Sequence, residues 1–319
     1  MALFVGTVLQ TGVDKIIGTL RDFSLWHFFI FLGVSVIYYL LYAVRWFIII
    51  KTLHPNKVGF GDIFLHRLSG YSVSYLTPSA QTGGEPLRVI LLQHDGVPAK
   101  DATSSVVIDK GLEIASLLLF QIVGFFIASM TGSFPQEIKA IATVVLVIFV
   151  IFIVWFYYSS MRNKGVFSSV FRFFRLNKHP KIRHFEEKIL EVEHQMAQFY
   201  KHHLKIFLWL IPLSLAITAF YLVEHYLIAR FMHVNLTFTQ LFLVSTVPYF
   251  AYLIPIPGGL GLLEGAHAAM FAALGVNINA FVLVFIIRIR DLVFVFIGLI
   301  HASKQGIKML KNAFTKPSP

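Results

Sequence analysis

The sequence predicts an all-α, polytopic membrane protein with two inverted repeats, each containing a re-entrant broken-helix hairpin. Hydrophobic residues make up 57% of the 319 residues and charged residues only 13%, about half the charged share of a soluble domain. Several apolar runs approach or exceed the ~20 residues needed to cross a bilayer. Two glycine- and proline-rich stretches, PSAQTGGEP (78–86) and PIPGGLG (255–261), interrupt otherwise apolar sequence.

The predicted helices follow one another with short connections. Residues 1–22 carry no basic region before an apolar run and no cleavage site after it, so they are not a signal peptide. Membrane spans are expected over 23–50, 99–131, 136–160, 204–230 and 278–302. Shorter helical segments are expected over 60–76, 86–94, 238–254 and 260–274.

These elements group into six predicted parts. They are an interfacial helix (1–22), a first membrane repeat (23–131, with its hairpin at 60–94), a connecting span (132–160), a basic cytoplasmic amphipathic segment (161–203), a second membrane repeat (204–302, with its hairpin at 238–274) and a basic cytoplasmic tail (303–319).

Basic residues are concentrated beside the predicted spans. Residues 161–205 hold ten Lys and Arg, and 303–319 hold four Lys without an acidic residue, out of 27 in the chain. This clustering is the positive-inside pattern of a membrane protein and argues against a nucleic-acid partner despite the net charge of +11. It predicts a multi-pass plasma (inner) membrane protein with 161–203 and the C-terminus in the cytoplasm.

The same segment carries an apolar stripe at helical spacing. Its members are Phe185, Ile189, Val192, Met196 and Phe199. The stripe predicts packing on the protein's own membrane helices, and a partner-binding helix is the alternative.

An internal repeat underlies the fold prediction. Phe60, Phe64, Leu65 and Tyr71 align with Phe238, Phe242, Leu243 and Tyr249, and a Gly-Gly pair follows each segment. With 161–205 and the tail inside, counting spans makes the two hairpins enter from opposite faces. Inverted repeats with broken helices near the midplane are a transporter architecture. A chance match of two apolar segments is the alternative.

The first glycine- and proline-rich stretch, residues 78–86, predicts an anion-binding site. Glu85 lies between Gly84 and Pro86, and proline favours the first turn of a helix. The free N–H groups of such a helix start, with Gly83, Gly84 and Arg88, suit a lipid phosphate. A simple i,i+3 pair between Glu85 and Arg88 is the alternative.

Two predicted spans carry charges that are costly in lipid. Asp109, Lys110 and Glu113 lie in the first, and Arg288, Arg290 and Asp291 in the second. Each costs roughly 2.5–3.5 kcal/mol at a helix centre. We therefore expect Asp109 and Glu113 to face Arg288 or Arg290 across a polar interior. This is either a structural ion-pair network or a site that also contacts substrate or a proton.

Glu264 follows the second glycine- and proline-rich stretch, residues 255–261, which contains Gly258 and Gly259. With no cation near it in the sequence, it is the strongest candidate for proton coupling. A metal site from Glu264 and His267 is a minor alternative, and we expect no metal or cofactor. Arg45 is expected to reach toward the membrane interface.

The chain resembles the transmembrane flippase domain of the lysylphosphatidylglycerol synthase/flippase family over residues 23–302. The resemblance is carried by Arg45-Trp46, Pro78…Gly84-Glu85-x-x-Arg88, Asp109-Lys110…Glu113, Pro255-x-Pro257-Gly258-Gly259-Leu260-Gly261-x-x-Glu264 and Arg288…Arg290-Asp291. It implies movement of lipids, such as aminoacylated phosphatidylglycerol, between leaflets. Family members with synthase activity carry an additional soluble domain that these 319 residues do not contain, so we expect no synthase activity here.

The sequence thus predicts a lipid flippase or transporter with no catalytic residues, because motifs such as GxSxG, HExxH and the P-loop are absent. The expected substrate-binding residues are Gly83, Gly84, Glu85, Arg88, Asp109, Lys110, Glu113, Gly258, Gly259, Glu264, Arg288, Arg290 and Asp291. The expected partners are anionic or aminoacylated phospholipids, with a homo-oligomer left open. The alternatives are a membrane enzyme or accessory subunit acting on a lipid or polyprenyl phosphate, and a scaffold that binds partners through 161–203.

Overall fold

A computed structural model describes residues 24–55, 58–130, 136–173, 180–276 and 279–315. Within these residues the chain is helical and forms no strand, which confirms the all-α prediction. The interfacial helix predicted over 1–22 lies outside the described residues.

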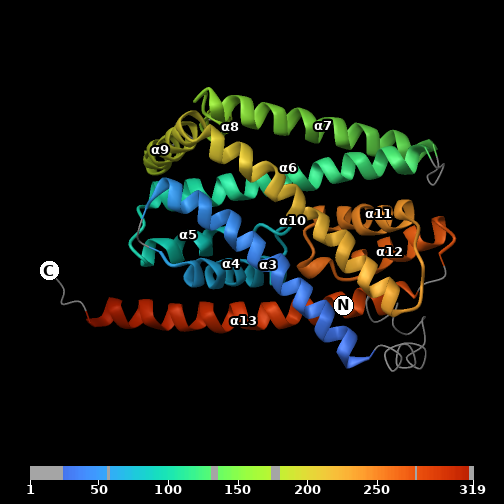
Figure 1. Cartoon of the computed structure of the whole chain (residues 1–319). Helices are drawn as coiled ribbons and strands as arrows, with labels where there is room; N and C mark the ends of the chain where they lie inside the picture. The colour runs from blue at the N-terminus through green and yellow to red at the C-terminus, as the bar shows by residue number, and fades with distance from the viewer. Residues whose placement is uncertain (1–23, 56–57, 131–135, 174–179, 277–278, 316–319) are drawn as a thin grey trace.

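Long helices form the frame of the molecule (Figure 1). They are α3 (Leu25–Leu53), α6 (Ala99–Met130), α7 (Gln136–Met161), α10 (Leu204–Phe231) and α13 (Ala280–Thr315). Four of them, α3, α6, α7 and α10, contain apolar stretches long enough to cross a membrane. The predicted bounds agree within a few residues, except that α13 continues to Thr315 through most of the predicted tail.

Shorter elements lie within and beside this frame. They are α4 (Phe60–Leu76), α5 (Glu85–His94), α8 (Val166–Phe173), α9 (Pro180–His202), α11 (Phe238–Thr246), the 3₁₀ segments η2 (Val247–Leu253) and η3 (Pro257–Gly259), and α12 (Leu262–Ala273). The helix predicted over 238–254 changes from α to 3₁₀ after Thr246. Pro248 follows directly and has no N–H to continue the α-helical pattern.

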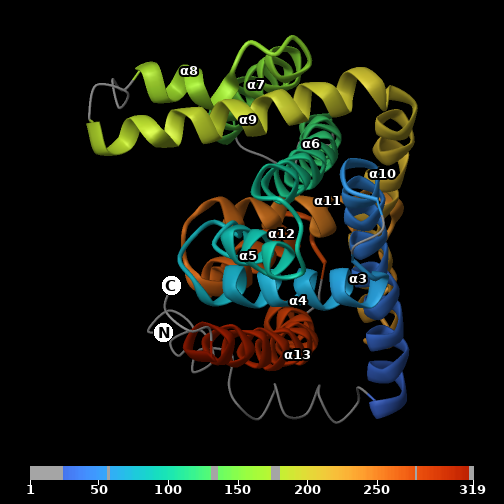
Figure 2. The same cartoon turned by 90° about the vertical axis from the view of Figure 1, so that its left-hand side faces the viewer.

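The two short-helix pairs occupy different parts of the bundle. In Figure 1, α4 and α5 lie toward the left and α11 and α12 toward the right. Seen from the left, α4 and α5 are in front of α11 and α12 (Figure 2). The turn before α5 packs so tightly on α4 that a Cβ on Gly84 would lie 1.7 Å from the Gly70 carbonyl oxygen. Only glycine permits this approach.

The apolar stripe within residues 185–199 packs as the sequence predicts. Met196 and Phe199 of α9 are buried with Ile108 and Leu112 of α6. Val192 packs against the same cluster, and the side chain of Phe185 lies outside the described part. This face of α9 is therefore covered by the protein's own membrane helices.

Helix α13 packs along α4, although the two are far apart in the sequence. The Ser69 hydroxyl donates to the Gly298 carbonyl at 3.0 Å, and the Ser72 hydroxyl donates to the Val295 carbonyl at 2.9 Å. A Cβ on Gly298 would lie 2.2 Å from the Leu68 carbonyl oxygen. The two backbones therefore come together through a glycine, as is common between membrane helices.

We expect Gly298→Ala to destabilise the protein by about 1–3 kcal/mol, because the added methyl group must push α13 away from α4. The measurement is the apparent Tm in detergent, followed by tryptophan fluorescence. Gly306→Ala on the same helix is the matched control, since nothing lies within 4 Å of its added Cβ. Equal Tm values for the two variants would contradict this account of the α4–α13 contact.

Candidate functional site

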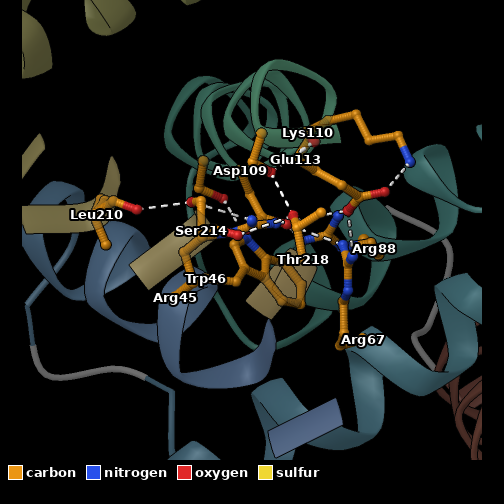
Figure 3. A network of polar contacts seen from close by, with 12 residues as sticks. Arg45, Trp46, Arg67, Arg88, Asp109, Lys110, Glu113, Leu210, Ser214 and Thr218 are labelled. Atoms are coloured by element: carbon orange, nitrogen blue, oxygen red, sulfur yellow. Dashed lines mark hydrogen bonds and ion pairs between the residues drawn. The ribbon is translucent and has the colours of Figure 1, made fainter. Parts of the chain in front are cut away.

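Asp109 is the centre of a buried ionic cluster (Figure 3). Its carboxylate, fully buried on α6, accepts hydrogen bonds from Arg45 of α3 at 2.8 Å, Arg67 of α4 at 2.9 Å and Arg88 of α5 at 2.7 Å. One carboxylate thus ties α6 to three other helices. Charge-assisted bonds of this kind are the stronger ones in proteins.

A second carboxylate on the same face of α6 extends the cluster. Glu113 pairs with Arg67 at 2.5 Å and with Lys110 at 2.6 Å, while Glu85 pairs with Arg88 at 2.7 Å. We call this set the Asp109 cluster: Arg45, Arg67, Glu85, Arg88, Asp109, Lys110 and Glu113. Four cations and three carboxylates give it a formal charge of +1.

Aromatic rings complete the surroundings of these guanidinium groups. Arg88 stacks on Trp46 with its Cζ 3.9 Å from the ring centroid, and Arg45 and Arg67 lie 4.9 and 4.6 Å from the ring centroid of Tyr42. Cation–π contacts of this kind stabilise a desolvated guanidinium by about 2 kcal/mol.

A second buried cluster surrounds Arg288 of α13. Its guanidinium pairs with both oxygens of Glu264 on α12, at 2.9 and 3.2 Å. It also donates to the Tyr75 hydroxyl at 3.0 Å and to the carbonyl oxygens of Gly258 and Gly259. Arg288 therefore holds the second glycine turn in place.

Arg290, also on α13, pairs with Glu224 of α10 and, at 3.0 Å, with its neighbour Asp291. The Ser35 hydroxyl of α3 donates to Glu224 at 2.7 Å. We call the five charged residues Glu224, Glu264, Arg288, Arg290 and Asp291 the Arg288/Arg290 cluster. Its formal charge is −1.

These contacts correct three sequence-based expectations. Asp109 and Glu113 pair with Arg45, Arg67, Arg88 and Lys110 and not with Arg288 or Arg290. Glu264 is not without a cation, because Arg288 approaches it from another helix. Arg45 does not reach the interface: it is fully buried.

The polar groups of the two glycine turns bond to the protein itself, and this corrects the expectation that they bind a ligand. The Gly83 and Gly84 amides donate to the hydroxyls of Ser79 and Ser74, both at 2.8 Å. The carbonyls of Gly258 and Gly259 accept from Arg288. Both turns are satisfied within the protein, and Glu85 and Arg88 form the i,i+3 pair.

Members of both clusters line a cavity of ≈ 360 Å³. Arg67, Lys110 and Glu113 come from the Asp109 cluster, and Arg290 and Asp291 from the Arg288/Arg290 cluster. Seven tyrosines also line it: Tyr38, Tyr39, Tyr42, Tyr71, Tyr221, Tyr249 and Tyr252. The volume lies in the range of small-ligand sites.

Several of these residues were not among the predicted site residues. Arg67 bonds both Asp109 and Glu113, and Glu224 binds Arg290. Both residues carry a charge within a predicted helix, and such a charge is as costly in lipid as that of the predicted site residues. This charge is the sequence signal that points to them. No group of three or more His, Asp or Glu side chains within the described ranges is arranged to hold a metal ion.

A bundle of apolar helices with ionic clusters buried inside defines a multi-pass α-helical membrane protein. Residues 1–298 match the family model for the lysylphosphatidylglycerol synthase TM region, and the chain belongs to this family. None of the solved structures matches this chain.

Its similar relatives are archaeal membrane proteins. A UPF0104 membrane protein of Methanothermobacter thermautotrophicus is 26% identical over 74% of this chain and 72% of its own length. One of Pyrococcus horikoshii is 26% identical over 75% of this chain and 74% of its own length. A third, of Methanocaldococcus jannaschii, is 30% identical over 40% of this chain and 39% of its own length.

We expect Asp109→Asn to destabilise the protein by about 3–5 kcal/mol, because it leaves three buried guanidinium groups without their shared carboxylate. Glu85→Gln is the matched control within the same cluster. Its side chain is 20% exposed, and Arg88 keeps its bond to Asp109, so a loss of about 1 kcal/mol or less is expected. Apparent Tm in detergent measures both, and equal losses would show that Asp109 is not the centre of the cluster.

Proposed function

We propose that this protein is a lipid flippase or transporter that moves an anionic phospholipid, such as phosphatidylglycerol or its aminoacylated form, between leaflets. The observation that carries the proposal is the cavity, which lies among membrane helices and is lined by charged side chains of both signs. Membership of the lysylphosphatidylglycerol synthase TM region family supports it.

The Asp109 cluster is the proposed phosphate-binding wall. Arg67 and Lys110 line the cavity, and their side chains remain 12% and 15% exposed while most of the cluster is more deeply buried. The cluster carries one positive charge more than its carboxylates balance. A phosphodiester with one negative charge neutralises that excess, and such a bond is strong in a low-dielectric interior.

The rest of the cavity suits the remaining parts of such a lipid. Asp291 and Glu113 also line the cavity, and in this proposal their carboxylates pair with the amine of an aminoacylated headgroup. Leu117, Leu118 and Phe149 provide an apolar wall on the α6–α7 side, where acyl chains can remain in contact with hydrocarbon. The proposed phosphate-binding residues are therefore Arg67 and Lys110, in place of the glycine turn that the sequence suggests.

The proposed orientation places the protein in the plasma membrane with residues 161–203 and the C-terminus in the cytoplasm, following the positive-inside rule. The α4–α5 and α11–α12 segments would then be the two re-entrant hairpins of an inverted repeat. Tyr71 and Tyr249, which align in the predicted repeat, both line the cavity.

We expect Lys110→Gln to slow lipid exchange roughly tenfold or more, because one charge-assisted hydrogen bond contributes about 1.5–3 kcal/mol. The measurement follows acyl-chain-labelled phosphatidylglycerol in proteoliposomes with a quencher added outside. The wild-type protein should accelerate exchange of this lipid over the protein-free rate. Lys304→Gln, an exposed lysine on α13, should exchange lipid at the wild-type rate.

Two outcomes would contradict the proposal. One is unaccelerated exchange by a correctly folded wild-type protein. The other is an unchanged rate in Lys110→Gln. A new lipid product formed without exchange would favour the membrane-enzyme alternative.

A further inference from the structure

Two buried histidines face each other in the second half of the protein. His225 of α10 and His267 of α12 are both fully buried, and their Nε2 atoms lie 3.2 Å apart. Their rings are nearly parallel, at 4°, with centroids 5.5 Å apart. That centroid distance is what two imidazole rings have when the two nitrogens point directly at each other. We call these residues the histidine pair.

The other ring nitrogens are already committed as donors. Nδ1 of His225 lies 2.7 Å from the Tyr221 carbonyl oxygen, and Nδ1 of His267 lies 2.9 Å from the Leu263 carbonyl oxygen. A carbonyl oxygen only accepts, so each Nδ1 carries the hydrogen. A neutral imidazole has only one N–H. With both rings neutral, two Nε2 lone pairs would therefore face each other in a buried site.

We propose that the histidine pair is a binding site for one proton, held as Nε2–H⁺···Nε2. One added proton turns two opposed acceptors into a donor and an acceptor, and 3.2 Å is at the long end of hydrogen-bond distances. A metal ion does not suit this geometry, because the two Nε2 lone pairs point along one line. An ion on that line would lie about 1.6 Å from each nitrogen, whereas zinc–nitrogen bonds are about 2.0 Å.

Charges of both signs surround the histidine pair. Arg290 opposes a positive charge on His225 and Arg288 opposes one on His267, whereas Glu264 favours a positive charge on His267. Glu224 precedes His225 in α10, and Tyr249 stands edge-on to both histidine rings. Each of the nearby arginines is paired with a carboxylate, and the Arg288/Arg290 cluster carries a formal charge of −1. One proton on the histidine pair brings the summed formal charge of the pair and this cluster to zero.

The site also lies close to the cavity. Tyr221, whose carbonyl holds His225, and Tyr249, whose ring touches both histidines, line the cavity wall. If the proposed function holds, an anionic headgroup neutralises the Asp109 cluster and the proton neutralises the other cluster. Anion and proton would then bind together without net charge in the membrane interior. This last step rests on the proposed function, whereas the proton site itself does not.

The test is solid-state NMR of the full-length protein in phosphatidylglycerol-containing liposomes, with all 13 histidines labelled at their ring nitrogens. At neutral pH we expect one imidazolium hydrogen-bonded through Nε2 to an unprotonated Nε2, seen as a nitrogen–nitrogen correlation. His267→Gln should remove this signal, because the glutamine amide donates to the His225 Nε2 without an added proton. The variant therefore keeps the contact and should fold.

His301→Gln is the matched control. His301 Nε2 lies 3.1 Å from Nδ1 of His66, whose Nε2 is 2.7 Å from Asp95, and this contact can form with both rings neutral. The control should leave the imidazolium signal intact. Two neutral rings at positions 225 and 267 in the wild-type spectrum would overturn the proposal. Because no lipid movement is measured, that result would leave the proposed transport function standing.

Discussion

A charge inside a membrane protein must be matched by charges from other helices, and this constraint determines how the helices of this protein are placed. Removing an ion from water costs several kcal/mol even after relaxation, and only well-placed partners offset that cost. Asp109 meets the requirement with three arginines from three helices. The positions of α3, α4 and α5 around α6 therefore depend on one carboxylate.

In the second half of the protein the buried charges are also matched by charges from other helices, but here cations are at the centre and carboxylates surround them. Two guanidinium groups of α13 form ion pairs with carboxylates of α10 and α12. The first cluster has an excess of one cation and the second an excess of one anion. Charged residues of both clusters line the tyrosine-lined cavity. Walls with charges of both signs favour an anionic headgroup bound together with a proton or an aminoacylated headgroup that carries its own cation, and this agrees with the proposed function.

The helices could be predicted because their signals are local. Apolar runs define the spans, and Pro86 and Pro248 mark where helices begin or change. Helix α13 extends beyond its predicted end because its last part, although basic in sequence, remains helical. The ion pairs could not be predicted, since Arg45 and Asp109 are 64 positions apart and nothing local distinguishes a buried arginine from an interfacial one. Arg67 differs from these residues, because a charge inside a predicted helix is a signal that the sequence itself contains.

The contact between α4 and α13 limits how the protein can move. Ser69, Ser72 and Gly298 bring the backbones of these two helices together, and Tyr75 of α4 bonds Arg288 of α13. Helix α4 belongs to the first predicted repeat and α13 to the second, so this contact crosses the boundary between them. If the protein moves a headgroup past the cavity as proposed, the motion must either carry α4 and α13 together or separate them. Separation would remove the Tyr75 hydroxyl from the buried Arg288 guanidinium and open the close contact at Gly298. Because a buried charged group that loses a hydrogen bond is costly in a dry interior, we expect the two helices to move as one unit.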